Sequence, residues 1–160
     1  MQAVFEKKEY KRLVRCDIFG VARRFVRDIQ CCWQRCRKGY CYRDICDIDL
    51  WFLEIMPDML RDFRKISQGI PNRIYQKYSQ EENGEEKAER EWNAIIKRME
   101  HLFREANEET CQKKNPYAKA KGEMEKEKYY EEEQKLAEYR CRCKNEALQL
   151  FSEWFYDLWD

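Results

Sequence analysis

The stretch from Gly39 to Leu60 constrains the fold most, because it combines a helix stop, a cap and an apolar helix. Gly39 predicts the end of a preceding helix, since glycine readily adopts the left-handed conformation found there. Asp44 is a candidate N-cap, with Asp47 at the capping-box position three residues later. Apolar residues then recur every three or four positions, which predicts one helix face: Ile45, Ile48, Phe52, Ile55, Met56, Met59, Phe63 and Ile66.

One acidic residue, Asp49, falls on that apolar face, and Arg140 falls on the apolar face of the last predicted helix. Either charge would be costly if it were buried alone. We therefore predict that the two side chains form a buried ion pair within hydrogen-bond reach. The alternative is that Asp49 lies at the rim of the face and reaches water. Leu50 and Trp51 point away from the face and suggest a second contact, with another helix or another chain.

The same periodicity predicts three further helices, over residues 17–38, 85–111 and 123–158. Asp17 is a candidate cap for the first of these, whereas residues 1–16 give no clear expectation. Pro57 lies inside the 45–66 helix and predicts a kink there. Turn-forming residues predict loops over 67–84 and 112–122. The expected architecture is a single all-α domain over 1–160, a bundle of about four main helices with a long C-terminal helix.

Composition narrows the class of protein. A chain of 160 residues with five Gly and three Pro suits one helical domain with a real core. No run of 18 apolar residues and no secretion signal is found, so a cytoplasmic location and reduced thiols are expected for the nine cysteines. The cluster Cys31, Cys32, Cys36, Cys41 and Cys46 lacks a zinc-site spacing, and we expect no metal and no cofactor.

Positive charge is concentrated at the start of the chain. Residues 1–43 hold twelve Lys/Arg and four Asp/Glu, a balance of +8, and because the whole chain carries +1 the remainder carries −7. Arg23, Arg24 and Arg27 share one face of the 17–38 helix with Cys31 and Lys38, and Arg35 lies beside them. This surface can face a phosphate, an acidic partner or the acidic part of the same chain. Cys31 among arginines is predicted to have a lowered pKa and to react before Cys32 and Cys36.

Catalytic motifs are absent from the sequence. It contains no glycine-rich phosphate loop, no HExxH, no GxSxG and no Cys-His pair with a plausible third member. The 85–111 helix is predicted to carry an apolar stripe of Ala88, Trp92, Ile95, Ile96, Met99, Leu102, Phe103 and Ala106. The single histidine, His101, lies opposite this stripe and is expected to be solvated. We therefore expect a protein that is not an enzyme, and nucleic acid is an improbable partner because no DNA-binding spacing occurs.

Two short segments carry a family resemblance. They are Arg37-Lys-Gly-Tyr-Cys-Tyr-Arg-Asp-Ile-Cys-Asp-Ile-Asp-Leu-Trp51 and Glu91-Trp-Asn-Ala-Ile-Ile-Lys-Arg-Met99. Over residues 20–110 the chain resembles small all-helical proteins encoded by bacteriophages, in which a Gly-aromatic pair precedes an Asp and then Trp-x-Leu-Asp. Here Cys46 stands in place of that Trp, and Ile48-Asp49 matches the end. The resemblance implies a phage accessory protein in a bacterial cytosol and brings no established activity.

Two hypotheses of function follow. In the first, the protein sequesters a phosphate-bearing nucleotide signal of host defence, with six residues as ligands: Arg24, Arg27, Arg35, Arg43, Tyr40 and Trp51. In the second, it is a protein–protein interaction module that inhibits a host protein through a helical surface. The acidic stretch 123–133 and an exposed Trp51 favour this second hypothesis. A homo-oligomer without membrane contact is expected in both.

Overall fold

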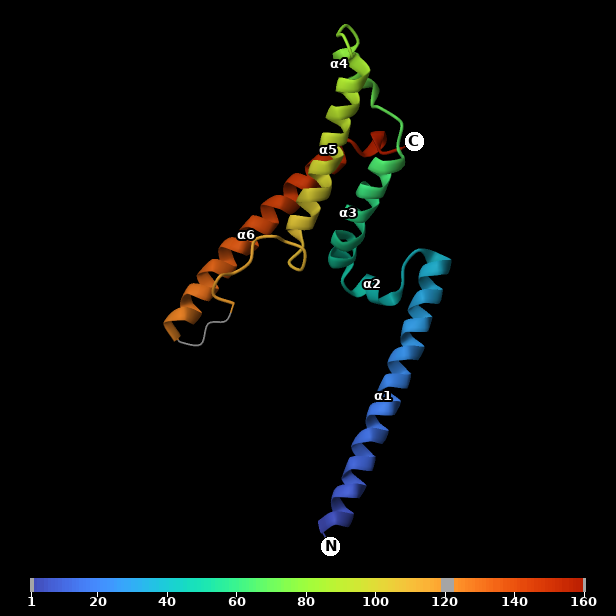
Figure 1. The fold of residues 1–160 in the computed structure, drawn as a ribbon, viewed down its shortest axis with the longest axis vertical. Helices are drawn as coiled ribbons and strands as arrows, with labels where there is room; N and C mark the ends of the chain where they lie inside the picture. Colours follow the sequence, from blue (N-terminus) through green and yellow to red (C-terminus); the bar gives the residue numbers. More distant parts are fainter. Residues whose placement is uncertain (1, 119–122, 160) are drawn as a thin grey trace. The chain divides into compact units, whose positions relative to one another are not determined.

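The structure is a computed structural model that describes the backbone of residues 2–118 and 123–159, and the side chains of 20–118 and 125–159. Within these residues the chain is all-α, as predicted, and contains no strand (Figure 1). Its elements are α1 (Gln2–Lys38), α2 (Tyr42–Cys46), α3 (Ile48–Ile66), α4 (Asn72–Tyr78), α5 (Gly84–Ala106), α6 (Glu123–Glu153) and the short 3-10 helix η1 (Phe155–Asp157).

The chain divides into two compact units, where its length led us to expect one domain. The amino-terminal unit is Met1–Ile48 and the carboxy-terminal unit is Asp49–Asp160. The amino-terminal unit forms because the turn at Gly39 brings α2 into contact with the end of α1.

In the amino-terminal unit, α1 is one uninterrupted helix that ends at a turn leading into α2 (Figure 1). It begins at Gln2, so Asp17 lies within the helix and does not cap it as predicted. Residues 2–16, whose pattern predicts no clear structure, are helical in backbone. The predicted end of the helix at Lys38 is confirmed.

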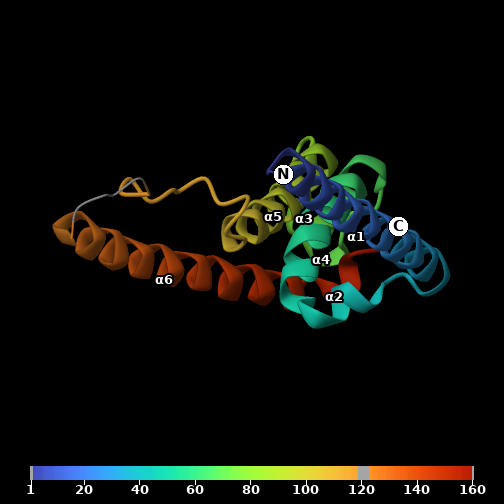
Figure 2. The same cartoon turned by 90° about the horizontal axis from the view of Figure 1, so that it is seen from below.

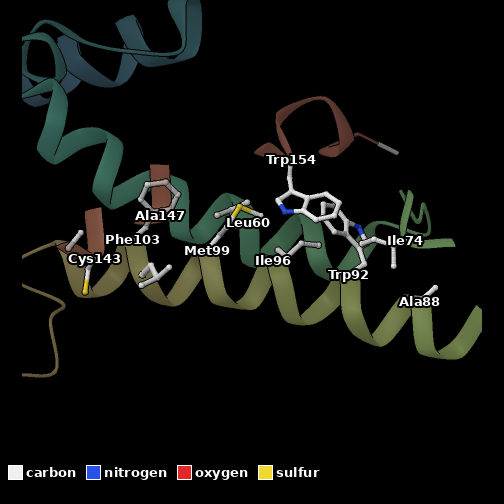
Figure 3. Close-up of a cluster of buried hydrophobic side chains, with 12 residues drawn as sticks. Leu60, Ile74, Ala88, Trp92, Ile96, Met99, Phe103, Cys143, Ala147 and Trp154 are labelled. Atoms are coloured by element: carbon white, nitrogen blue, oxygen red, sulfur yellow. The ribbon is translucent and has the colours of Figure 1, made fainter. Parts of the chain in front are cut away.

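The carboxy-terminal unit is built around α5. The stripe predicted for this helix is confirmed, because Ala88, Trp92, Ile96, Met99 and Phe103 are all buried. They line one side of α5 and meet Leu60 of α3, Ile74 of α4 and Ala147 of α6, with Trp154 beside Trp92 (Figure 3). Burial of this much aromatic and aliphatic surface is the main stabilising contribution in the unit.

Three phenylalanines join three helices within that core. Phe52 of α3 meets Phe103 of α5 edge to face, with ring centroids 5.5 Å apart. Phe151 of α6 lies 6.3 Å from Phe52 and 6.2 Å from Phe103, again in edge-to-face geometry. Such contacts stabilise beyond the area that they bury. The cluster therefore fixes α3, α5 and α6 relative to one another.

Three predicted boundaries are wrong. The loop predicted over 67–84 contains α4, because Ile74 reaches the core from a turn of helix that starts after Pro71. The helix predicted to reach Cys111 ends at Ala106, where the Thr110 hydroxyl donates to the Arg104 carbonyl oxygen at 2.7 Å. The last helix ends at Glu153 and is followed by η1, where a single helix to Leu158 was expected.

The amino-terminal half of α6 runs alongside the segment that follows α5 (Figure 2). The Asn115 side-chain amide donates to the Tyr129 carbonyl oxygen at 3.0 Å and to Glu133 Oε2 at 3.2 Å. These bonds anchor the segment to the polar half of the helix.

Candidate functional site

Gly39 and Cys41 build the turn that follows α1. Gly39 has φ +80°, and its amide donates to the Arg35 carbonyl oxygen at 2.8 Å, so it ends α1 as predicted. The N-cap of α2 is Cys41, and not Asp44 as predicted. Asp44 lies three residues further on, where its Oδ2 accepts a hydrogen bond from the Cys41 amide at 2.7 Å. It therefore fills the capping-box position that we predicted for Asp47.

A two-pronged ion pair ties this turn back onto α1. Arg35 donates from Nη2 to Asp44 Oδ1 at 2.5 Å and from Nε to Asp44 Oδ2 at 3.1 Å. The Asp44 side chain is buried, whereas Arg35 is about half exposed. The hydrogen bonds from Arg35 hold the pKa of Asp44 well below the usual carboxyl range. This pair was not predicted, because two charges nine residues apart become neighbours only through the geometry of the turn.

The six predicted ligand residues do not form one site within either unit. Arg35 is engaged by Asp44, and Arg43 pairs with Asp28 at 2.9 Å. Arg24 and Arg27 are exposed and form no ion pair with any side chain that the structure describes. Tyr40 is exposed at the turn, whereas Trp51 is half-buried and belongs to the carboxy-terminal unit.

The prediction of a reactive Cys31 is wrong. Its thiol is buried, and burial raises the pKa of Cys31 above the ordinary value. The cause is the turn, because Cys31 lies on the side of α1 where Cys41, also buried, returns to the helix. Cys32 and Cys36 point elsewhere and are exposed. The order of thiol labelling is therefore expected to be the reverse of the one predicted from sequence.

The predicted Asp49–Arg140 ion pair is not formed. Arg140 pairs instead with Glu133 at 2.9 Å and approaches Glu108 at 4.0 Å. Glu133 lies two turns earlier on the same face of α6, so it is the nearer acid along the helix. Asp49 is exposed in the first turn of α3. A carboxylate suits that position, because it faces the positive end of the helix dipole.

A second buried acid, Glu105, was not singled out from the sequence. It accepts hydrogen bonds from the Tyr139 hydroxyl at 3.0 Å and from the Gln112 amide at 3.1 Å, and the Cys111 thiol lies 3.7 Å away. These contacts join the end of α5, the segment after it and α6. The arrangement satisfies a buried carboxylate and serves structure.

The apolar face of α1 is exposed. Five large side chains on it, each between 53 and 64% exposed, are Val21, Phe25, Val26, Ile29 and Trp33. The helix positions of Arg23, Arg24 and Arg27 place them on the other side of α1. Exposed apolar rows of this length mark interaction sites in folded proteins.

A shorter exposed row lies on α3. The apolar face predicted for this helix is wider than the surface that the core covers. Only one edge of the face packs inward, the edge that carries Phe52, Met56 and Phe63. Three other members of the face remain exposed in the carboxy-terminal unit: Ile55 at 40%, Met59 at 58% and Ile66 at 68%. At 100° per residue, these three project from α3 within about 40° of one another. We call them the α3 row.

Several kinds of site find no support among the described residues. No three metal-binding side chains come together there, and none of the helices has the length and apolar character needed to cross a membrane. His101 is exposed and forms no ion pair with a described residue, as its position opposite the stripe predicted. No protein-family model matches the chain, and comparisons with curated proteins and with solved structures give no match either.

Proposed function

We propose that this chain is a non-enzymatic binding protein that docks α3 on another protein. The observation that carries the proposal is the α3 row, three large apolar side chains that lie in water on a helix whose other side is in the core. A helix that presents anchors one and two turns apart fits an apolar groove on a partner.

The α3 row is held on a rigid support. Pro57 and Leu60 on the same helix are buried. Asp58 accepts a hydrogen bond from Arg104 of α5 at 2.8 Å, and Arg64 lies 3.6 Å from Glu100. A partner therefore meets side chains whose backbone is already ordered, which reduces the entropic cost of association.

Charged residues border the α3 row. Asp62 pairs with Lys65 at 2.8 Å, and both are exposed. An apolar centre with a polar rim is the usual composition of a protein–protein interface. The resemblance of residues 20–110 to small phage-encoded helical proteins points to a bacterial host protein as the partner, met in the cytosol and inhibited by the contact.

The experiment begins with a photo-crosslinking amino acid at position 59 of the tagged chain, expressed in bacteria. Crosslinked proteins are identified by mass spectrometry, and the best candidate is purified for calorimetry with the unmodified chain. Met59→Glu is expected to weaken that binding at least about tenfold, because it places a charge in a desolvated contact. Leu148→Glu, an exposed apolar position on α6, is the control and should bind as the unmodified chain does. Equal binding by all three chains would refute the proposal.

Nucleotide sequestration is a second candidate, favoured by Arg24 and Arg27, which form no ion pair with a described side chain. Forked guanidinium groups match phosphate oxygens. Calorimetric titration with cyclic dinucleotides and trinucleotides tests it, with Arg27→Ala expected to weaken binding by about tenfold. Absence of measurable heat with every nucleotide would remove this candidate and leave docking through α3 untouched.

A further inference from the structure

We propose that the exposed face of α1 is a seam through which copies of this chain associate. The seam consists of Ala22, Phe25, Ile29, Cys32 and Cys36, all exposed. Their spacings alternate between three and four residues, which is the heptad pattern of helices that pack side by side. The inference stands on α1 alone and does not depend on docking through α3.

Residues beside the seam extend its apolar surface. Val21, Val26 and Trp33 occupy the flanking positions of the heptad and are each more than half exposed. From Ala22 to Cys36 the seam is about 21 Å long at 1.5 Å per residue. Helices that form a bundle carry apolar residues at the flanking heptad positions as well as at the two central ones.

The charges of α1 leave the seam free for a second copy. In the heptad most basic residues fall at the outer positions, away from the seam: Arg23, Arg24, Arg27 and Lys38. Arg37 also starts from an outer position, but its guanidinium lies 5.4 Å from the centroid of the Trp33 ring. Two copies joined at the seam therefore keep most of this positive charge apart. The flanking charges are Asp28 and Arg35, which have opposite signs and each have a partner in the same chain, Arg43 and Asp44.

The same charge pattern disfavours an acidic groove as the occupant. The walls of such a groove reach the positions beside the apolar face, and a favourable contact there needs unpaired cations at those positions. Here Arg27 points directly away from the centre of that face, at 180° from Cys36 by helical geometry. Charge complementarity therefore favours a neutral apolar surface like the seam itself.

The turn after α1 keeps the seam clear. Arg35 donates hydrogen bonds to Asp44, and the Tyr42 amide donates to Gln34 Oε1 at 3.0 Å. Cys41 is buried on the side of α1 that carries Cys31. Cys31 and Gln34 lie on the outer side of α1. Among residues 20–48, whose side chains the structure describes, nothing therefore covers the seam.

The test is sedimentation velocity of the full chain over low to high micromolar concentrations, with a phosphine reductant to exclude disulfide-linked species. The unmodified chain is expected to form dimers or larger assemblies as its concentration rises. Ile29→Glu should weaken this association by about a hundredfold, because a charge in the seam would have to be desolvated. Arg27→Glu is the matched control, with the same new side chain on the outer side, and should associate as the unmodified chain does.

Two outcomes would overturn the proposal. One is an unmodified chain that remains monomeric at every concentration, whether or not it sediments with phosphatidylcholine–phosphatidylglycerol vesicles. The other is association that Ile29→Glu and Arg27→Glu weaken equally. Circular dichroism of each variant at the concentration used shows whether helix content is retained, and Phe25→Ser provides a second, uncharged seam variant if Ile29→Glu fails to fold.

Discussion

The two units of this protein use the same kind of amphipathic helix in different ways. In the carboxy-terminal unit, the stripe of α5 is covered by α3, α4 and α6, and Phe103, Met99 and Ala88 are fully buried. In the amino-terminal unit, the apolar face of α1 is bare, and the described buried residues are Cys31, Cys41 and Asp44. One unit is therefore held by hydrophobic burial and the other by a capped turn and an ion pair, although both helices show the same periodicity.

The largest contrast is expected from truncating one phenylalanine in each unit. Phe103→Ala should lower the free energy of unfolding by about 3–5 kcal/mol, because it leaves a cavity among Phe52, Phe151 and the rest of the core. Phe25→Ala should change it by less than about 0.5 kcal/mol at concentrations too low for association. Urea denaturation followed by circular dichroism measures both. Equal losses would contradict the division between a buried and a bare stripe.

Two glycines sharpen the comparison with smaller, opposite effects. A Cβ added to Gly84 would clash with the Tyr78 carbonyl oxygen, so Gly84→Ala should destabilise the carboxy-terminal unit by roughly 1–3 kcal/mol. A Cβ at Gly20 meets nothing within 4 Å. Gly20→Ala should therefore stabilise α1 by about 0.5–1 kcal/mol, because alanine is the better helix former. Hydrogen exchange, measured on peptides from α1 and from α5, reports the stability of each helix separately. If Gly20→Ala also lowered the protection of its helix, the expected stabilisation of α1 would be contradicted.

The ion pair of the amino-terminal unit is tested by thiol labelling. Asp44→Ala removes the partner of Arg35 and of the Cys41 amide, so Cys31 and Cys41 should be modified about tenfold faster by a maleimide. Asp28→Ala, which removes only the exposed partner of Arg43, should leave both rates unchanged. Peptide mass spectrometry reads out each cysteine. Unchanged labelling in Asp44→Ala would show that something other than this carboxylate holds the turn.

The smallest expected effect is the pH dependence of the Arg35–Asp44 ion pair. The pKa of Asp44 is lowered in the folded chain by the hydrogen bonds from Arg35. Its stabilising contribution is therefore complete above the ordinary carboxyl pKa of about 4 and is lost only as the pH falls through the lower folded-state value. Protection of the Cys41 amide from hydrogen exchange should persist at pH about 4 and disappear in stronger acid. Loss of protection already at mildly acidic pH would contradict the assignment.

Periodicity predicted the helices of this chain but not their neighbours. The stripe of α5, the end of α1 at Lys38 and the long last helix were all found as predicted, because 3.6-residue spacing and a terminal glycine act locally. The same spacing in α1 and α3 marks which residues share a face and says nothing of what covers that face. The exposure of Phe25 and Met59 was therefore beyond sequence reasoning.

The candidate site was predicted less well, since it depends on which charges become neighbours. Arg35 and Arg43 were expected to bind a ligand, and both meet acids of the same unit. Asp49 and Arg140 were expected to meet each other, and Glu133 is the acid that Arg140 contacts. The pairs of Arg35 and Arg43 are set by a short turn, which a helical wheel does not show. Glu133 and Arg140, in contrast, share one face of α6, so their pairing was open to sequence reasoning and was overlooked.

The exposure of Trp33 gives the amino-terminal unit an optical signal. It is the one tryptophan among residues 1–48, and its indole lies in water beside the seam. Its emission should therefore occur at long wavelength, while the buried Trp92 and Trp154 emit at shorter wavelength. Trp159 of the carboxy-terminal unit is also exposed, at 69%. In a chain that carries Trp159→Phe, iodide should therefore quench Trp33 more strongly than the tryptophans of the carboxy-terminal unit.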